Sequence, residues 1–222
     1  MIRIEQKIYQ HQGNSAVIQL VPRNAKKILD VGCGAGSNAA VLSAKGCIVD
    51  GVTLSEEEGV IAQKFCRNVY IHNLENGLPT EIDENYDACI CSHVLEHICW
   101  PEILLTEIRE ILLCEKGTLV VALPNLFNYR DRLKLLMGRF EYSENGGIWD
   151  NTHFRWYTFE SAQRLLVQNG FTITSAYAEG GFPFWKLRKI LPKFTVLIDR
   201  LSCKYSPGLF GFQLIIVAHP SL

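Results

Sequence analysis

Short apolar runs alternate along this chain with longer segments in which apolar residues recur every three or four positions. Runs of the first kind predict strands, and the spacing of the second kind predicts amphipathic helices. The strand-like runs cover residues 27–31, 47–54, 68–73, 86–92, 117–124, 171–177 and 212–218. Because strands and helices alternate, we expect a doubly wound α/β domain in which helices cover both faces of a largely parallel sheet.

Several residues mark where the predicted helices begin and end. Pro101 suits the first turn of one helix, whose apolar residues share a single face. Thr158 suits the N-cap of another helix, and Asn169-Gly170 ends it. These signals place both helices between predicted strands, as the alternating pattern requires.

Two segments interrupt this alternation. Residues 126–156 are rich in arginine, asparagine, glycine and aromatic side chains. Residues 183–207 separate the last two strands and are divided by Pro192. We therefore expect a single domain over residues 1–222, with a lid insertion at 126–156 and a helical insertion at 183–207.

Composition narrows the classes of function. With a formal charge of −1, the chain of 222 residues has no global field that would recruit nucleic acid or an anionic membrane. Its N-terminus lacks the apolar core of a signal peptide, and no apolar run is long enough to span a membrane. The eight cysteines form no Cys-x-x-Cys pair. We expect free thiols in a reducing cytoplasm, without a disulfide scaffold or a zinc site.

The first predicted strand leads directly into a glycine-rich loop. Residues 28–36 read Ile-Leu-Asp-Val-Gly-Cys-Gly-Ala-Gly, with Asp30 near the end of the apolar run and glycines at every second position after it. Glycine lets the backbone turn sharply and lets a ligand approach without an intervening Cβ. The spacing differs from the Gly-x-Gly-x-x-Gly loop of dinucleotide-binding proteins. The loop therefore predicts a ligand site of another kind.

Further polar residues follow the later strands. Asn73-Leu74 follow the third predicted strand, and Ser92-His93 lie at the end of the fourth. Because the carboxyl ends of parallel strands meet at one edge of a doubly wound sheet, ligands bind in the crevice there. We expect these residues and the glycine loop to line one crevice.

Together these motifs resemble the class I S-adenosylmethionine (SAM) methyltransferases over residues 26–171. Residues 93–97 (His-Val-Leu-Glu-His) and 152–158 (Thr-His-Phe-Arg-Trp-Tyr-Thr) are similar to a bacterial subgroup related to the ubiquinone-biosynthesis O-methyltransferases. The resemblance implies a Rossmann-like, doubly wound seven-stranded sheet whose last strand is antiparallel. It also implies SAM as the cofactor and S-adenosyl-L-homocysteine (SAH) as the product.

The resemblance also implies a cofactor site. The aspartate and the glycine loop after the first strand would hold the methionine end of SAM, and the end of the second strand would face the ribose. The pair after the third strand would bracket the adenine, and the pair at the end of the fourth would lie near the methionine or the transferred methyl. The residues for the methionine end are Asp30, Gly32, Cys33, Gly34 and Gly36, and those for the ribose are Thr53 and Leu54. The pair at the adenine is Asn73 and Leu74, and the pair near the methionine or the methyl is Ser92 and His93.

Two positions depart from the family pattern. The family usually has an acid for the ribose hydroxyls where this chain has Thr53, and Asn73 replaces a common aspartate. A neutral hydroxyl lacks the charge-assisted hydrogen bonds that an acid makes. Glu57 is a candidate substitute from the next helix turn, whereas Asp50 lies on the other face of its strand. The departures predict modest affinity for SAM.

Three histidines and a glutamate carry the candidate chemistry. His93, Glu96 and His97 fall on one helical turn, where some similar methyltransferases place Glu-x-x-Glu-His to hold a divalent ion. A metal site here would begin with His93 and add His153 as a distal ligand. The alternative is structural hydrogen bonding, which we favour, so we predict no metal. His97 and His153 are the candidate catalytic residues, because neutral imidazole is a suitable general base near pH 7, although His153 would serve equally as an anchor for the lid.

Basic and aromatic side chains interleave in the helical insertion at 183–207, which carries a single acid, Asp199. A helix that makes peripheral contact with a membrane or a lipid-linked substrate has this composition. A helix that packs its apolar face on the domain or on a second copy, and exposes a basic side, has it as well. We favour the packed helix, and we expect no nucleic-acid partner.

The sequence thus predicts an enzyme that moves a methyl group from SAM to a small-molecule, sugar-linked or lipid-linked acceptor, on oxygen in preference to nitrogen or carbon. The alternative is a catalytically degenerate SAM-fold protein that binds a partner, which Thr53 and Asn73 favour and the intact glycine loop opposes. The acceptor pocket would lie in the two insertions. Four arginines of the first insertion would grip an anionic or sugar-nucleotide acceptor or lie at the lid surface: Arg130, Arg132, Arg139 and Arg155. Neither the acceptor nor the oligomeric state follows from this pattern.

Overall fold

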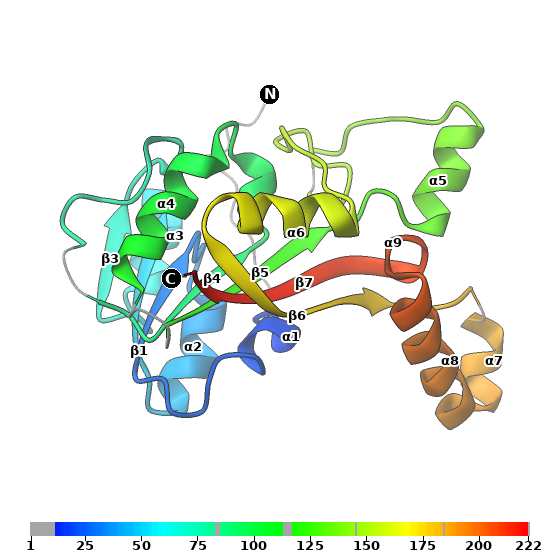
Figure 1. The fold of residues 1–222 in the computed structure, drawn as a ribbon, viewed down its shortest axis with the longest axis horizontal. Coiled ribbons are helices and arrows are strands. Elements are labelled where there is room, and N and C mark those ends of the chain that lie inside the picture. The colour runs from blue at the N-terminus through cyan, green and yellow to red at the C-terminus, as the bar shows by residue number, and fades with distance from the viewer. Residues whose placement is uncertain (1–11, 83–84, 113–116, 145, 184, 222) are drawn as a thin grey trace.

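The computed structural model describes residues 12–82, 85–112, 117–144, 146–183 and 185–221. Within them a seven-stranded sheet forms the centre of the molecule, in the order β3-β2-β1-β4-β5-β7-β6 (Figure 1). Strands β1 to β5 are parallel, and β7 runs antiparallel to both β5 and β6. This topology confirms the predicted doubly wound sheet. The strands are β1 (Lys27–Val31), β2 (Ile48–Thr53), β3 (Asn68–Ile71), β4 (Ala88–Ser92), β5 (Thr118–Pro124), β6 (Phe171–Gly180) and β7 (Gly211–Pro220).

Helices cover both faces of the sheet (Figure 1). Successive side chains of β1 point to opposite faces, so Leu29 and Val31 join a core with α4 and α6, whereas Ile28 joins a core with α1, α2 and the end of α3. The helices are α1 (Ser15–Ile18), α2 (Ser37–Ala44), α3 (Glu56–Ala62), α4 (Pro101–Ile111), α5 (Tyr129–Leu136), α6 (Phe159–Gln168), α7 (Trp185–Ile190), α8 (Pro192–Tyr205) and α9 (Pro207–Phe210), with 3-10 turns η2 (Leu74–Asn76) and η3 (Leu95–His97).

Local sequence sets several of these boundaries. Pro101 is the first residue of α4, where its fixed φ suits a helix start. Thr158 caps α6 through a capping box, in which its side chain accepts from the Ser161 backbone N–H at 3.1 Å and its own N–H donates to Ser161 Oγ at 2.8 Å. Each apolar run of the sequence coincides with a strand. The cysteines in the described residues are free, as predicted.

The two insertions form helices at one end of the molecule. Figure 1 shows α5 and the group α7–α9 together at the end away from β3. They meet where Arg132 Nη2 donates to the Gly208 carbonyl at 3.5 Å, and where the rings of Tyr129 and Phe210 lie 6.1 Å apart. Among the described residues, no helix is long and apolar enough to cross a membrane.

A buried carboxylate joins β2 to its neighbours. Asp50 is fully buried and accepts from the Tyr86 hydroxyl at 2.9 Å, from Arg67 Nε at 3.0 Å and from the backbone N–H of Asn68 at 3.1 Å. Burial raises the pKa of Asp50, but the hydrogen bonds from Arg67 and Tyr86 outweigh it and hold the pKa below its usual value. The Asp50 carboxylate therefore has a structural role, because its oxygens are already used in hydrogen bonds within the fold.

Replacement of Tyr86 by phenylalanine tests this anchor. Tyr86→Phe removes one donor to a buried carboxylate, so we expect the free energy of unfolding to fall by about 1–3 kcal/mol. Urea denaturation at neutral pH measures the loss. The exposed Tyr142 provides a matched control, since Tyr142→Phe should leave stability unchanged. Equal stability of the two variants would contradict the assignment.

Candidate functional site

The glycine loop connects β1 to α2 through backbone that only glycine adopts readily. Gly32, Gly34 and Gly36 have φ of 73°, 53° and 78°. A Cβ on Gly32 would lie 2.4 Å from a methyl carbon of Val94, and a Cβ on Gly36 would lie 3.0 Å from the Ala62 Cα. The three glycines therefore bring the loop close to the segment after β4 and to α3.

Asp30 lies near the end of β1, fully buried beneath this loop. Neither oxygen of its carboxylate has a hydrogen-bond partner among the described residues. Burial raises the pKa of Asp30 to about 7, although the nearby Asn38 side chain, which lies outside hydrogen-bond geometry, acts to lower it. An unpartnered buried carboxylate is costly, so Asp30 is suited to a ligand that brings a positive charge or hydrogen-bond donors.

An acid in the first turn of α3, Glu58, lies beside Thr53 at the end of β2. Thr53 Oγ1 donates to Glu58 Oε2 at 3.1 Å, and Ser55 caps α3 by accepting from the Glu58 N–H at 3.3 Å. Glu58 is buried, whereas Glu57 is exposed. A Cβ built on Gly34 would lie 3.5 Å from Glu58 Oε1. The acid that supplements Thr53 beside the glycine loop is thus Glu58, one residue after the expected one.

The two residues after β3, Asn73 and Leu74, differ in their exposure. Asn73 is exposed, and its side-chain oxygen caps η2 by accepting from the Glu75 N–H at 3.1 Å. Leu74 is buried. Leu74 therefore has the position of an apolar contact, while the Asn73 oxygen is already used locally.

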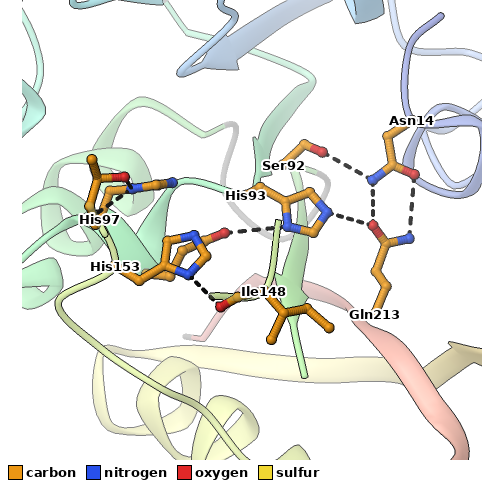
Figure 2. Close-up of polar contacts among 9 residues, drawn as sticks. Asn14, Ser92, His93, His97, Ile148, His153 and Gln213 are labelled. Atoms are coloured by element: carbon orange, nitrogen blue, oxygen red, sulfur yellow. Dashed lines mark hydrogen bonds and ion pairs between the residues drawn. The ribbon is translucent and has the colours of Figure 1, made fainter. Parts of the chain in front are cut away.

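Asn14 and Gln213 join the residues at the end of β4 in a network that spans the chain (Figure 2). Asn14 Nδ2 donates to Ser92 Oγ at 3.1 Å and to Gln213 Oε1 at 2.7 Å. The same Gln213 oxygen lies 2.7 Å from His93 Nε2, and His93 Nδ1 lies 3.3 Å from Glu96 Oε1. Segments from both ends of the described chain thus meet at β4.

His93 faces an acceptor on each ring nitrogen. The Gln213 oxygen and the Glu96 carboxylate both accept, so the ring donates from both nitrogens when it is an imidazolium. Burial lowers the pKa of His93, but the Glu96 carboxylate and Gln213 raise it above its usual value overall. The backbone of His93 is left-handed, with φ of 58°, which turns the chain away from β4 toward η3.

Glu96 is fully buried in η3, and apart from the ion pair with His93 its oxygens have no hydrogen-bond partner among the described residues. Burial raises the pKa of Glu96, but the hydrogen bond and charge of His93 and the charge of His97 lower it below its usual value overall. Glu96 is therefore an ionised acceptor at the bottom of this site.

The hydrogen bonds of His97 define its tautomer. Thr152 donates its hydroxyl proton to Asp150 Oδ1 at 2.7 Å, so Thr152 Oγ1 can only accept from His97 Nδ1, which lies 3.0 Å away. The Thr152 carbonyl, 3.1 Å from the same nitrogen, also only accepts. His97 therefore carries its proton on Nδ1, and its Nε2 presents a lone pair.

His153 is held in the same way. Its Nδ1 lies 3.1 Å from the Ile148 carbonyl oxygen, which accepts, so its Nε2 also presents a lone pair (Figure 2). The rings of His97 and His153 meet edge to face with their centroids 4.6 Å apart. Burial lowers the pKa of His153, which favours neutral imidazole.

Three hydrogen-bond acceptors lie close together, on Glu96, His97 and His153. One nitrogen or oxygen atom of each lies within 4.8 Å of the others, in the grouping expected of a metal site or a proton-accepting site. His93 is outside this group, because its nitrogens face Gln213 and Glu96. The structure thus brings His153 beside His97, but it does not support His93 as the first ligand of a metal.

A family model described as a methyltransferase domain matches residues 9–176, well over half of the chain. The chain belongs to this methyltransferase family. Membership confirms the predicted resemblance, the enzyme class and SAM as the cofactor.

Curated relatives of this methyltransferase include two ubiquinone biosynthesis O-methyltransferases. The protein of Chromobacterium violaceum is 32% identical over 108 residues, which cover 41% of this chain and 44% of the relative. The protein of Pseudomonas putida F1 is 30% identical over 92 residues, which cover 36% and 37%. The chain thus matches less than half the length of either relative.

Solved structures share the fold at low identity. A SAM-dependent methyltransferase from Archaeoglobus fulgidus gives a TM-score of 0.58 at 21% identity, covering 88% of this chain and 86% of its own. The magnesium protoporphyrin IX methyltransferase from Synechocystis PCC 6803 with bound SAH gives 0.57 at 19% identity, covering 93% and 80%. These likenesses confirm the fold.

The tautomers can be measured directly by NMR of the imidazole nitrogens. We expect His97 and His153 to be protonated on Nδ1 alone, and His93 to titrate with a pKa above the usual histidine value. In Thr152→Val, which removes the hydroxyl but keeps the carbonyl, the His97 signals should shift and those of His153 should keep the Nδ1–H pattern. A proton on Nε2 of His97 or His153 in the wild type would refute the assignment.

Proposed function

We propose that this methyltransferase transfers a methyl group from SAM to an oxygen of a small-molecule, sugar-linked or lipid-linked acceptor. The observation that carries the proposal is the group of acceptor atoms on Glu96, His97 and His153 beside the end of β4. A hydroxyl nucleophile must lose its proton during transfer, and an unprotonated imidazole nitrogen is suited to take it.

The cofactor would bind at the carboxyl ends of β1, β2 and β3. Asp30 would accept from the α-ammonium group of SAM, whose positive charge offsets the burial of the carboxylate. The loop at 32–36 would approach the methionine end closely. Glu58 would accept from the ribose hydroxyls beside Thr53, and Leu74 would pack on the adenine. Support comes from the unpartnered oxygens of Asp30 and the burial of Glu58 and Leu74.

The transfer itself would be a direct displacement. The acceptor oxygen forms a bond to the methyl carbon as the bond from that carbon to the sulfonium sulfur breaks, and SAH leaves. The hydroxyl proton passes to Nε2 of His97 or His153. Because a sulfonium is an intrinsically reactive donor, orientation and exclusion of water would supply much of the rate enhancement.

The same three residues also fit a divalent cation. Imidazole nitrogen and carboxylate oxygen are common ligands, and the hydrogen bonds from Nδ1 of His97 and His153 to carbonyl oxygens are typical of ligating histidines. A bound cation would lower the pKa of an acceptor hydroxyl. The metal-free mechanism is our proposal, because His93 already supplies a positive partner for Glu96.

The acceptor pocket would lie under the insertion at 126–156, which leads to His153, and beside the helical insertion at 183–207. The rings of Phe140, Tyr142 and Trp149 pack edge to face within this lid, with centroids 4.9 Å and 4.7 Å apart. The names of the curated relatives support a phenolic hydroxyl as the first acceptor class to test.

A degenerate, partner-binding protein is the alternative function. Two departures from the family pattern favour this alternative: Thr53 stands where the family has an acid, and Asn73 stands where it commonly has an aspartate. Glu58 hydrogen-bonds to Thr53 and supplies an acid there, which leaves Asn73 as the one feature in its favour. Tight SAM binding without turnover of any acceptor class would support that alternative.

Asp30 should make cofactor affinity depend on pH. With a pKa of about 7, its carboxylate is mostly charged above that pH and mostly neutral below it, so affinity for the ammonium of SAH should fall by about fivefold from pH 7 to pH 6. Isothermal titration with SAH measures this. Asp30→Asn should bind weakly at both values, and the exposed control Glu57→Gln should behave as the wild type. An unchanged affinity in Asp30→Asn would exclude this role.

The two histidines should affect turnover more than cofactor binding. We expect His97→Gln or His153→Gln to lower kcat by about 10²–10⁴-fold, the range for loss of a general base, while the Kd for SAH changes little. Transfer of labelled methyl from SAM to alkyl-substituted phenols and catechols, followed by mass spectrometry, measures this. Val60→Ser, exposed on α3, is the control.

Full activity in both histidine variants would refute the proposed role. Loss of wild-type activity in a chelator, restored by Mg²⁺ or Zn²⁺, would assign the group to a cation.

A further inference from the structure

Helix α8 presents its large apolar side chains outward. Phe194, Leu197, Leu201 and Tyr205 fall at helical spacing along one stripe, and their exposed fractions are 54%, 51%, 42% and 76%. We call these four residues the α8 stripe. Helices that pack on a core show the opposite arrangement, with the apolar stripe turned inward.

The buried side of α8 is built from small and polar residues instead. Thr195 and Cys203 are buried, and the Thr195 hydroxyl donates to the Pro192 carbonyl at 2.9 Å. Asp199 accepts from Arg188 Nη2 at 2.8 Å and from the Phe182 N–H at 2.8 Å. The inner side of α8 thus carries polar contacts and small side chains, while its apolar stripe is exposed.

A row of basic side chains borders the α8 stripe. At 100° per residue, Lys193, Arg200 and Lys204 fall along one edge of it, and all three are exposed. The single acid of α8, Asp199, is neutralised by Arg188. The exposed part of the helix therefore combines apolar side chains with positive charge and no free carboxylate.

The same end of the molecule carries a second apolar patch. Leu133, Leu136, Met137 and Phe140, in α5 and just after it, are 48–85% exposed. Figure 1 shows α5 at the same end as α7–α9, and the contact of Arg132 with Gly208 joins the two groups.

We infer that this end of the molecule, the α8 stripe with its basic row and the apolar residues of α5, docks on the surface of a bilayer that contains anionic lipid. The positive charge of the basic row favours anionic lipid over a second copy of this chain as the partner. A second copy packed stripe to stripe with its α8 antiparallel would set the basic rows close to each other, whereas phosphate headgroups complement them and the acyl region receives the apolar stripe. The inference does not depend on the proposed methyl transfer, because docking needs no cofactor.

Docking would also bring a lipid-borne acceptor to the lid. The segment that follows α5 returns to the proposed site, since Trp149 Nε1 donates to Asp131 Oδ1 in α5 at 2.8 Å and the neighbouring Ile148 carbonyl accepts from His153. The surface that meets lipid is thus connected to the histidine that would act on the acceptor. This consequence rests on the proposed function, whereas docking itself does not.

Cosedimentation of the full chain with vesicles tests the inference. The protein should sediment with vesicles of phosphatidylcholine mixed with phosphatidylglycerol, and much less with phosphatidylcholine alone. Lys193→Glu combined with Lys204→Glu should lower the partition coefficient at least tenfold, because each basic residue near anionic lipid contributes about fivefold. Phe194→Ser combined with Leu201→Ser should lower it to a similar extent.

Two controls make the result specific. Lys45→Glu and Val60→Ser change exposed residues just after α2 and in α3, outside this end of the molecule, and should bind as the wild type. Thermal unfolding of each variant confirms that it is folded. Equal binding to neutral and anionic vesicles, or unchanged binding in both double variants, would overturn the inference. A dimer that Phe194→Ser with Leu201→Ser dissociates would assign the face to a second copy and would overturn it as well.

Discussion

Two carboxylates buried near the ends of neighbouring parallel strands dominate the physics of this molecule. Asp30 in β1 has no hydrogen-bond partner among the described residues, and Glu96, which follows β4, has only the ion pair with His93. Burying an unpaired charge costs several kcal/mol, and a fold carries such a cost where a ligand or a reaction makes use of it. One of these acids lies at the end of β1, which leads into the glycine loop, and the other lies in the turn after β4.

The rest of the site serves to hold these two groups in place. The glycine loop brings backbone close to Asp30, and the left-handed turn at His93 directs the chain into the turn that carries Glu96. His97 and His153 are fixed by hydrogen bonds through Nδ1, and one ring nitrogen of each lies within 4.8 Å of a Glu96 oxygen. Orientation of this kind is what a proton acceptor needs if it is to act at a single hydroxyl.

Much of this arrangement could be predicted from local sequence. The strands follow from apolar runs, the start of α6 from the capping box at Thr158, and the glycine loop from its spacing. Long-range contacts were not available to the same reasoning. Gln213 is 120 residues from His93 and nevertheless bonds to it, and no local pattern marks that pair. The choice of Glu57 over Glu58 failed because it depends on the rotation of α3 by a single residue.

Helix α8 shows another limit of sequence patterns. The spacing of its apolar residues predicts a stripe correctly, but periodicity does not tell which way the stripe faces. The pattern allows a stripe that packs on the domain or on a second copy; in the structure Asp199 binds Arg188 and the Phe182 N–H on the inner side, and the stripe points away from the domain. A polar contact between distant residues therefore decided the orientation.

A crystal structure with SAH bound would test the central claim most directly. The account predicts the amino group of SAH within hydrogen-bond distance of the Asp30 carboxylate, its ribose beside Glu58, and its sulfur directed toward the group formed by Glu96, His97 and His153. SAH bound elsewhere, or in the crevice with its sulfur turned away from the two histidines, would contradict the account.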